Sequence, residues 1–209
     1  MDYVGVDPMP ALDTMFFLVT GASGAGKSTV RRALTPSLGP AFDVVELATL
    51  GISPQWSLSW RHRVVEQVVQ RALLEHGQGR HFVLCGDPVP PGEVIAAPSG
   101  DRLGTIHVCL LDVGPDAQRA RLLQRGDAPE LIPHHLAFAE WMRRHVLEPG
   151  HRPDVITSDG WDQMRWDRWL SVETEPCWTT HIVDTTTRLP ADVAQKVFEW
   201  IQGRLQGSR

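Results

Sequence analysis

The sequence lacks asparagine altogether and has only two lysines, Lys27 and Lys196, against 18 arginines. The absence of asparagine excludes every site built on an Asn side chain, including the Asn-Lys-x-Asp motif with which G proteins read guanine. The three cysteines, Cys85, Cys109 and Cys177, are too few and too far apart to indicate a disulfide framework or a Cys-x-x-Cys metal site. We therefore expect a reducing compartment, the cytoplasm.

Long hydrophobic runs and an excess of basic charge are also missing. The apolar run from Met15 to Val19 is too short to cross a membrane, and the acidic residues before it do not resemble a signal peptide. A formal net charge of −5 argues against a general nucleic-acid-binding protein. The chain has 209 residues, 42% of them hydrophobic, so we expect one domain over residues 1–209 that forms a monomer or a homodimer.

Short apolar runs alternate with amphipathic stretches, a pattern typical of a parallel α/β sheet. The predicted strands are residues 15–20, 42–47, 81–85, 105–111 and 181–183. The predicted helices are residues 28–37 (ended by Thr35-Pro36), 62–76, 116–125, 134–147 and 190–205. Residues 88–100 are rich in proline and glycine and are predicted to form a loop. Residues 150–178 hold four of the eight tryptophans and are predicted to be an irregular insertion over the acceptor site or a small subdomain.

The strongest motif follows the first predicted strand. There, Gly21-Ala22-Ser23-Gly24-Ala25-Gly26-Lys27-Ser28-Thr29 fits the G-x-x-x-x-G-K-[ST] pattern of a phosphate-binding P-loop. The glycines allow the backbone to wrap closely around a phosphate, with several N–H groups pointing inward. Lys27 is predicted to neutralise the β and γ phosphates as a catalytic residue, and the Ser28 hydroxyl to bind Mg²⁺. The motif predicts a nucleotide site over residues 21–29.

Acidic residues lie at the ends of two other predicted strands, on the edge of the sheet that the P-loop shares. Asp87 follows the third strand, in Cys85-Gly86-Asp87-Pro88, where a second Mg²⁺ ligand is expected; an ordinary Asp-Pro turn is the alternative. Glu46, at the end of the second strand, is our candidate general base for an acceptor hydroxyl, with Asp43 as second choice. For Glu46 the alternative is a solvated acid at a strand end.

Two arginines precede a short polar turn. Arg121 and Arg125 are four residues apart on one predicted helix face, just before Gly126-Asp127-Ala128-Pro129. Residues 126–135 are predicted to form a lid, with Arg125 at its hinge as a catalytic residue that balances charge on the transferring phosphoryl group. A solvated helix face of mixed charge is the alternative.

Several tryptophans have two interpretations. Those at 161, 166 and 169 either line a pocket for a flat acceptor or, as we favour, belong to the core or a dimer contact. Trp56 and Trp60 follow the second strand, where acceptors bind in such folds, so they are better candidates for a substrate wall.

The histidines do not indicate a metal site. His134, His135 and His145 lack metal-ligand spacing and carry no Glu partner. His62 and His81 are predicted to be ordinary surface or edge residues.

The motifs together resemble the P-loop small-molecule kinases related to nucleoside-monophosphate kinases, most closely the gluconate kinase and chloramphenicol phosphotransferase type. The resemblance is carried by the P-loop, by Cys85-Gly86-Asp87-Pro88, by Arg121-Leu122-Leu123-Gln124-Arg125 and by His181-Ile182-Val183-Asp184-Thr185. It implies a three-layer α/β sandwich around a five-stranded parallel sheet of order 2-3-1-4-5. It also implies that ATP and Mg²⁺ are used, that Arg125 contacts the ATP phosphates or stacks on adenine, and that Thr185 to Arg188 lie near the base.

The sequence departs from the family in ways that leave the acceptor open. No Asp-x-Asp follows the second strand, and the lid has no zinc cysteines. We expect a phosphotransferase that moves the γ-phosphoryl group of ATP to a hydroxyl of a small molecule, such as a metabolite, nucleoside or antibiotic. The alternatives are a P-loop ATPase that acts on a protein or nucleic-acid partner, and a polynucleotide kinase, which the net charge disfavours.

Overall fold

The computed structural model describes residues 14–50, 57–170 and 178–207. The strands are β1 (Phe16–Thr20), β2 (Phe42–Val45), β3 (His81–Cys85), β4 (Ile106–Asp112) and β5 (Trp178–Asp184). The helices are α1 (Lys27–Leu38), α2 (Leu58–Gly77), α3 (Pro91–Ala96), α4 (Pro115–Arg125), α5 (Ile132–His145), α6 (Asp154–Thr157), α7 (Asp167–Leu170) and α8 (Pro190–Gly207). Short 3-10 helices are η1 (Leu47–Leu50), η2 (Gly100–Leu103) and η3 (Pro129–Leu131). Within these ranges no helix is both long and apolar enough to cross a membrane.

The five strands form one parallel sheet in the order β2-β3-β1-β4-β5. This confirms the predicted order. Strand β1 lies at the centre of the sheet. Strands β3 and β2 lie on one side of it and β4 and β5 on the other, so the direction in which the chain adds strands reverses at β1. Ligands of open parallel sheets bind at such a reversal, beyond the carboxyl ends of the strands. The residues that follow β1 therefore occupy the position where a ligand is expected.

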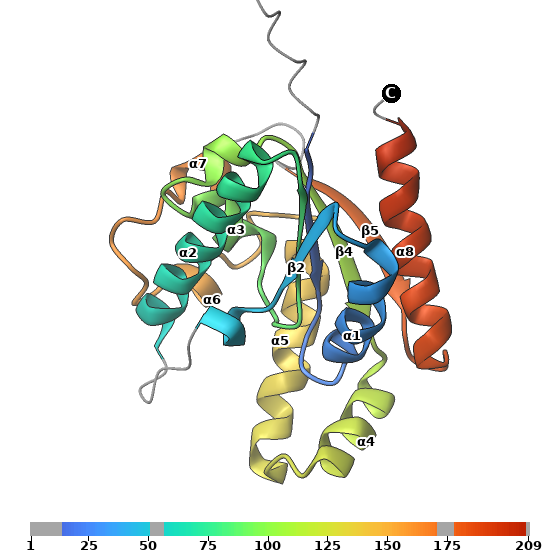
Figure 1. Ribbon diagram of the computed structural model, residues 1–209. Coiled ribbons are helices and arrows are strands. Elements are labelled where there is room, and N and C mark those ends of the chain that lie inside the picture. The colour runs from blue at the N-terminus through green and yellow to red at the C-terminus, as the bar shows by residue number, and fades with distance from the viewer. Residues whose placement is uncertain (1–13, 51–56, 171–177, 208–209) are drawn as a thin grey trace, which may run out of the picture.

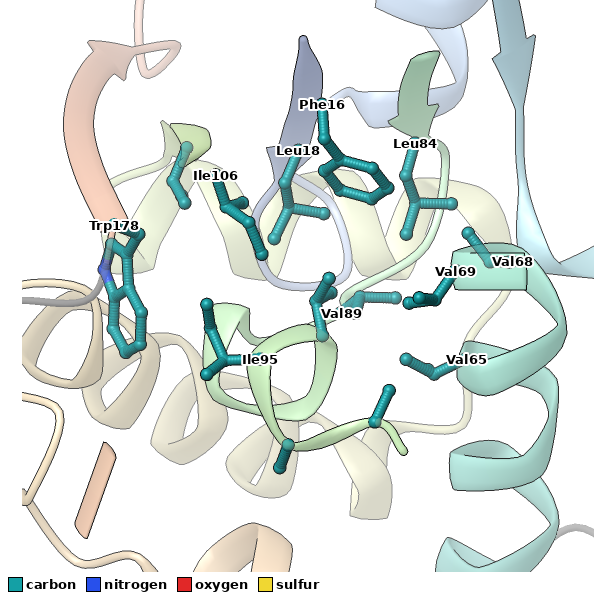
Figure 2. Packing of buried hydrophobic residues seen from close by; sticks show 14 of the residues in the cluster. Phe16, Leu18, Val65, Val68, Val69, Leu84, Val89, Ile95, Ile106 and Trp178 are labelled. Atoms are coloured by element: carbon teal, nitrogen blue, oxygen red, sulfur yellow. The ribbon is translucent and has the colours of Figure 1, made fainter. Parts of the chain in front are cut away.

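Helices cover both faces of the sheet, with α1 and α8 on one face and α2, α3 and α5 on the other (Figure 1). The central strand β1 is buried along its whole length because each face of the sheet is covered there, and its alternate residues pack in opposite directions. Phe16 and Leu18 join the core on the α2 side, where Val65 and Ile95 meet them (Figure 2). Phe17 packs toward α1 and α8. The predicted three-layer sandwich is confirmed.

Two local predictions were wrong. Helix α1 does not end at Thr35-Pro36 but continues to Leu38, with Pro36 inside it. The Thr35 and Ser37 hydroxyls donate to the carbonyls of Arg31 and Ala33, one turn earlier, so the last turn is held by side chains as well as by the backbone. Residues 88–100 are not only a loop, because Pro91 starts the short helix α3 with its fixed φ.

The described part of the Trp-rich segment, residues 150–170, contains the short helices α6 and α7 and holds α3 against the sheet. The Arg168 guanidinium donates to the carbonyls of Ile95 and Ala97, at 3.0 and 2.6 Å. The Trp169 indole donates to the Gly92 carbonyl at 2.9 Å, and its side chain is 2% exposed. The segment therefore shields α3 from solvent, and its side chains donate to carbonyls at the carboxyl end of α3.

Candidate functional site

The P-loop turns from β1 into α1 where two glycines are required. Gly21 has a φ of 150°, and a Cβ there would collide with the Leu111 carbonyl oxygen of β4. Gly26 precedes α1 with a φ of 98°, in the left-handed region that only glycine adopts without strain. The loop can therefore lie directly against the neighbouring strand and still enter the helix.

The loop leaves backbone donors open. No side chain among the described residues caps the start of α1, and its first turn contains no acid. Gly26 and Ser28 are exposed at this point, whereas Lys27 between them is buried. The first N–H groups of a helix have no intrahelical partner and attract anions. The geometry therefore suits a phosphate.

Three successive carbonyls of the loop accept hydrogen bonds from side chains. Lys27 Nζ donates to the Ala22 carbonyl at 2.8 Å, within the loop itself. From α4, Gln118 Nε2 donates to the Ser23 carbonyl at 2.9 Å and Arg121 Nη1 donates to the Gly24 carbonyl at 3.2 Å. These bonds fix the direction of each peptide plane.

The Lys27 ammonium is the central charge of the site. Burial lowers its pKa to about 8, and the nearby Asp87 carboxylate counteracts part of that decrease. The guanidinium groups of Arg125, which lines the same cavity as Lys27, and of Arg61 lower the pKa further. A cation with few other partners, held beside open N–H donors, is suited to bind phosphate oxygens.

The predicted acids have different surroundings. Asp87 Oδ2 accepts the Leu47 N–H at 2.6 Å, which ties the end of β3 to the end of β2. Glu46 pairs with Arg31 of α1 at 2.9 Å, and a Cβ at Gly86 would lie only 2.6 Å from Glu46 Oε2. Gly86 therefore allows the Glu46 carboxylate to lie beside the turn that carries Asp87.

Asp43, the second choice for a base, is engaged elsewhere. Its two carboxylate oxygens accept bonds of 2.7 and 3.0 Å from Arg71 of α2. A bidentate pair of this kind fixes the orientation of the carboxylate. Asp43 therefore connects β2 to α2, and Glu46 is the better placed of the two acids.

Ser28 and Asp87 are compatible with a magnesium ion. The Ser28 hydroxyl is exposed at the start of α1, and only one oxygen of the Asp87 carboxylate accepts a bond from Leu47. Hydroxyl and carboxylate oxygens are the hard ligands that Mg²⁺ prefers. The residues present fit the ion that the resemblance implies.

Two adjoining cavities open on the P-loop. One of about 380 Å³ lies over its phosphate-binding part, and Lys27, Ser28, Gly86 and Arg125 contribute to its wall. The other, of about 350 Å³, extends toward β5 and α8 and is lined by the following residues: Gly24, Ala25, Gly26, Thr29, Val30, Arg121, Thr185, Arg188, Pro190 and Val193. Their volumes and position suit a phosphate chain in the first cavity and a nucleoside in the second.

The two arginines of α4 have different roles in the structure. Arg121 lines both cavities and donates to the Gly24 carbonyl, the Thr185 hydroxyl and carbonyl, and the Thr186 carbonyl. Arg125 also lines the first cavity, but its side chain is 54% exposed and pairs with Asp127 of the predicted lid. Sequence reasoning favoured Arg125 and gave Arg121 no role of its own. The contacts of Arg121 with Thr185 cross 64 positions and leave no local signal.

A buried ion pair, Arg61 with Glu93, lies next to the turn that carries Asp87. Glu93 of α3 is fully buried and accepts a bond of 2.8 Å from Arg61 Nε, while Arg61 Nη2 donates to the Pro88 carbonyl at 2.6 Å. His62 is fully buried too, so its assignment to the surface was wrong. Its Nδ1 accepts the Trp161 N–H, and its Nε2 faces Glu93 Oε1 at 3.7 Å.

The tryptophans of the Trp-rich segment belong to the core on the α2 side, as we favoured. Trp169 is buried there, and Trp161 and Trp166 pack against the same cluster. Trp60 is partly buried and packs against that cluster as well. Trp56 lies outside the described residues.

No family model and no curated protein matches the sequence. Among solved structures, the chain is similar to a sugar kinase from Janibacter sp. HTCC2649, with a TM-score of 0.59 and 13% identity over 90% of this chain and 95% of that one. It is also similar to a gluconokinase from Sinorhizobium meliloti 1021, with a TM-score of 0.54 and 15% identity over 95% and 97% of the two chains. A shikimate kinase from Acinetobacter baumannii gives a TM-score of 0.51 and 17% identity over 92% and 96%. The chain therefore has the fold of the P-loop small-molecule kinases.

Proposed function

We propose that this protein transfers the γ-phosphoryl group of ATP, with Mg²⁺, to a hydroxyl of a small molecule. The observation that carries the proposal is the P-loop itself. Its backbone donors are open, Lys27 is buried beside them, and Asp87, between the cavity-lining Gly86 and Pro88 at the end of β3, acts electrostatically on Lys27. The solved structures with the same fold include a sugar kinase, a gluconokinase and a shikimate kinase, which agrees with this chemistry.

In this proposal the residues divide the work of phosphoryl transfer. The N–H groups at the start of α1 and the Lys27 ammonium bind the phosphate oxygens and stabilise the charge that develops on them. Ser28 and Asp87 hold Mg²⁺, which supplies further positive charge when it is bound. Arg125 adds charge from the first cavity, and residues 126–135 act as a lid over it.

Glu46 is the proposed general base. It lies beside Gly86 at the entrance to the turn that carries Asp87, where an acceptor hydroxyl would approach the γ-phosphate. Its ion pair with Arg31, at 2.9 Å, holds the carboxylate in place beside the end of β2. The Arg31 and Glu46 side chains are 25% and 21% exposed, so an acceptor can reach the pair.

The experiment is to measure ATP consumption with Mg²⁺, first alone and then against a panel of hydroxylated metabolites, nucleosides and antibiotics. Phosphate transfer to one compound, detected by mass spectrometry of that compound, is the expected result. Hydrolysis that no member of the panel changes would contradict it and favour an ATPase that acts on a protein or nucleic-acid partner. When the same assay is applied to Lys27→Ala, the matched control is Lys196→Ala, which removes the exposed second lysine.

A further inference from the structure

One buried glutamine connects the P-loop to the helix on the far side of the predicted lid. Gln118 of α4 has no exposed surface. Its Nε2 donates to the Ser23 carbonyl at 2.9 Å and to the His135 carbonyl at 3.3 Å. Ser23 belongs to the P-loop, and His135 lies in the first turn of α5, at the end of residues 126–135. The Gln118 side-chain amide therefore bonds to both the P-loop and α5.

The chemistry of the two partners requires a donor at this position. Both are carbonyl oxygens, which only accept, and the two N–H bonds of an amide nitrogen suit them. The Oε1 atom of Gln118 is buried without a hydrogen-bond partner among the described residues. The amide is therefore oriented to satisfy the two carbonyls although its own acceptor is left without a bond. A carboxylate in its place would bring negative charge against both oxygens.

The bond to Ser23 also sets the direction of a donor in the nucleotide site. In a trans peptide the C=O of one residue and the N–H of the next point in opposite directions. Because Gln118 holds the Ser23 carbonyl toward α4, the Gly24 N–H points away from α4. Gly24 lines both cavities of the site.

The link to α5 gives the same glutamine a second effect. Helices α4 and α5 run side by side and extend together away from the sheet (Figure 1). The predicted lid, residues 126–135, covers the connection between them and the first turn of α5, which begins at Ile132. A change in the position of the first turn of α5 alters the bond to His135 and, through the same nitrogen, the bond to Ser23.

We propose that Gln118 is a positioning residue that aims the Gly24 N–H at the nucleotide phosphates and couples the P-loop to the first turn of α5. The proposal rests on nucleotide binding at the P-loop. It predicts that binding of nucleotide restricts the motion of α5 near His135, because both carbonyls bond to the same amide group.

The test compares Gln118→Met with Gln124→Met, which changes an exposed glutamine on the same helix. Affinity for a non-hydrolysable ATP analogue with Mg²⁺ is measured by calorimetry. We expect Gln118→Met to bind about tenfold more weakly, since a lost buried hydrogen bond changes an equilibrium by about that factor. We expect Gln124→Met to bind as the wild type does.

Hydrogen exchange then separates coupling from a general loss of packing. In the wild type, saturation with the analogue should slow exchange of the amides of residues 132–138. At concentrations that saturate it, Gln118→Met should not show this slowing. Wild-type affinity together with wild-type slowing in Gln118→Met would overturn the proposal. If circular dichroism shows that Gln118→Met does not fold, the isosteric Gln118→Glu is tested for the same two results.

The two proposals fail in different ways. If the wild-type protein binds no nucleotide, the proposed function fails before Gln118 is tested. If the wild type binds nucleotide and the two glutamine variants behave alike, only the role of Gln118 is overturned.

Discussion

The two sides of the site are built on different physical principles. The phosphate side, residues 21–29 with α4, presents open N–H donors and one buried cation, and Gly26 and Ser28 are exposed. The proposed acceptor side, residues 86–96 with α2 and residues 158–170, buries the Arg61–Glu93 ion pair and His62 and packs tryptophans against the same region.

The two sides differ in whether their polar groups are paired within the protein or left for a ligand. The phosphate side leaves polar groups unpaired so that a ligand can pair with them, and its shape comes from glycines and a short local motif. The proposed acceptor side pairs buried polar groups through contacts between residues far apart in the sequence, such as Arg61 with Glu93, although His62 Nε2 and Glu93 Oε1 have no hydrogen-bond partner among the described residues. The first side should therefore lose activity when changed, and the second should lose stability.

The largest effect is expected for Lys27→Ala on the phosphate side. We expect turnover to fall about 1000-fold because the main cation facing the phosphates is removed. The melting temperature should change little, since within the described ranges the hydrogen bond of Lys27 Nζ is to the Ala22 carbonyl of its own loop. Steady-state kinetics and calorimetric melting measure the two effects, with Lys196→Ala as the control. Near-normal turnover in Lys27→Ala would contradict the proposed kinase function.

On the acceptor side, Glu93→Gln should destabilise the protein by about 3 kcal/mol. The change leaves the Arg61 guanidinium, whose side chain is 10% exposed, without its counter-ion. Urea unfolding measures the loss. Asp154→Asn is the control, because its pair with Arg152 is exposed on both sides and should contribute little. Equal stability of the two variants would show that the buried pair is not important for folding.

Glu46 lies between the two sides, and Glu46→Gln tests its proposed role as general base. We expect kcat to fall about 100-fold with little change in the KM for ATP, since a general base contributes to the chemical step. Asp43→Asn is the matched control, because its carboxylate is held by Arg71 away from this role. A raised KM for ATP with unchanged kcat would mean that Glu46 is not the base.

The smallest expected effect is the contribution of His145 to the pH dependence of the free energy of unfolding. The imidazole is buried between Trp141 and Trp169, its Nε2 accepts the Gly92 N–H, and burial lowers its pKa to about 4. The Pro149 carbonyl and Glu93 counteract this decrease, whereas His151 adds to it. The unfolded chain binds the proton near pH 6.5 and the folded chain only near pH 4, so stability falls as the pH decreases between these values.

We expect this histidine to account for about 2 kcal/mol of the stability lost between pH 7 and pH 5. Denaturant unfolding at a series of pH values measures it, and His145→Gln should remove that part of the slope. His134→Gln, at an exposed position of the same helix, should leave the slope unchanged. Identical slopes in both variants would show that the His145 ring is accessible to protons in the folded state.

Sequence reasoning succeeded where the signal is local. The strand before Gly21, the P-loop and the start of α1 were predicted because the motif fixes backbone geometry within nine residues. The sheet order followed from the resemblance. Helix α1 was predicted to within one residue at each end, although Pro36, which was taken as its stop, lies inside its last turn.

Tertiary contacts account for what was missed. His62 looks like a surface residue on a polar stretch, but the Trp-rich segment packs over it and Trp161 donates to its ring. Gln118 and Arg121 are two ordinary residues of an amphipathic helix, and only the folded chain brings them to the P-loop carbonyls. No periodicity in a single sequence records such contacts.

The aromatic cluster around His145 also has a spectroscopic consequence. Its ring stacks on Trp141 with centroids 4.7 Å apart, and Trp178 lies at 5.5 Å. Since this cluster joins α5, β5 and the hydrogen bond to Gly92 of α3, the indole emission depends on all three remaining together. This cluster is therefore a built-in fluorescent reporter, and a separation of α3 from α5 can be followed without an added label.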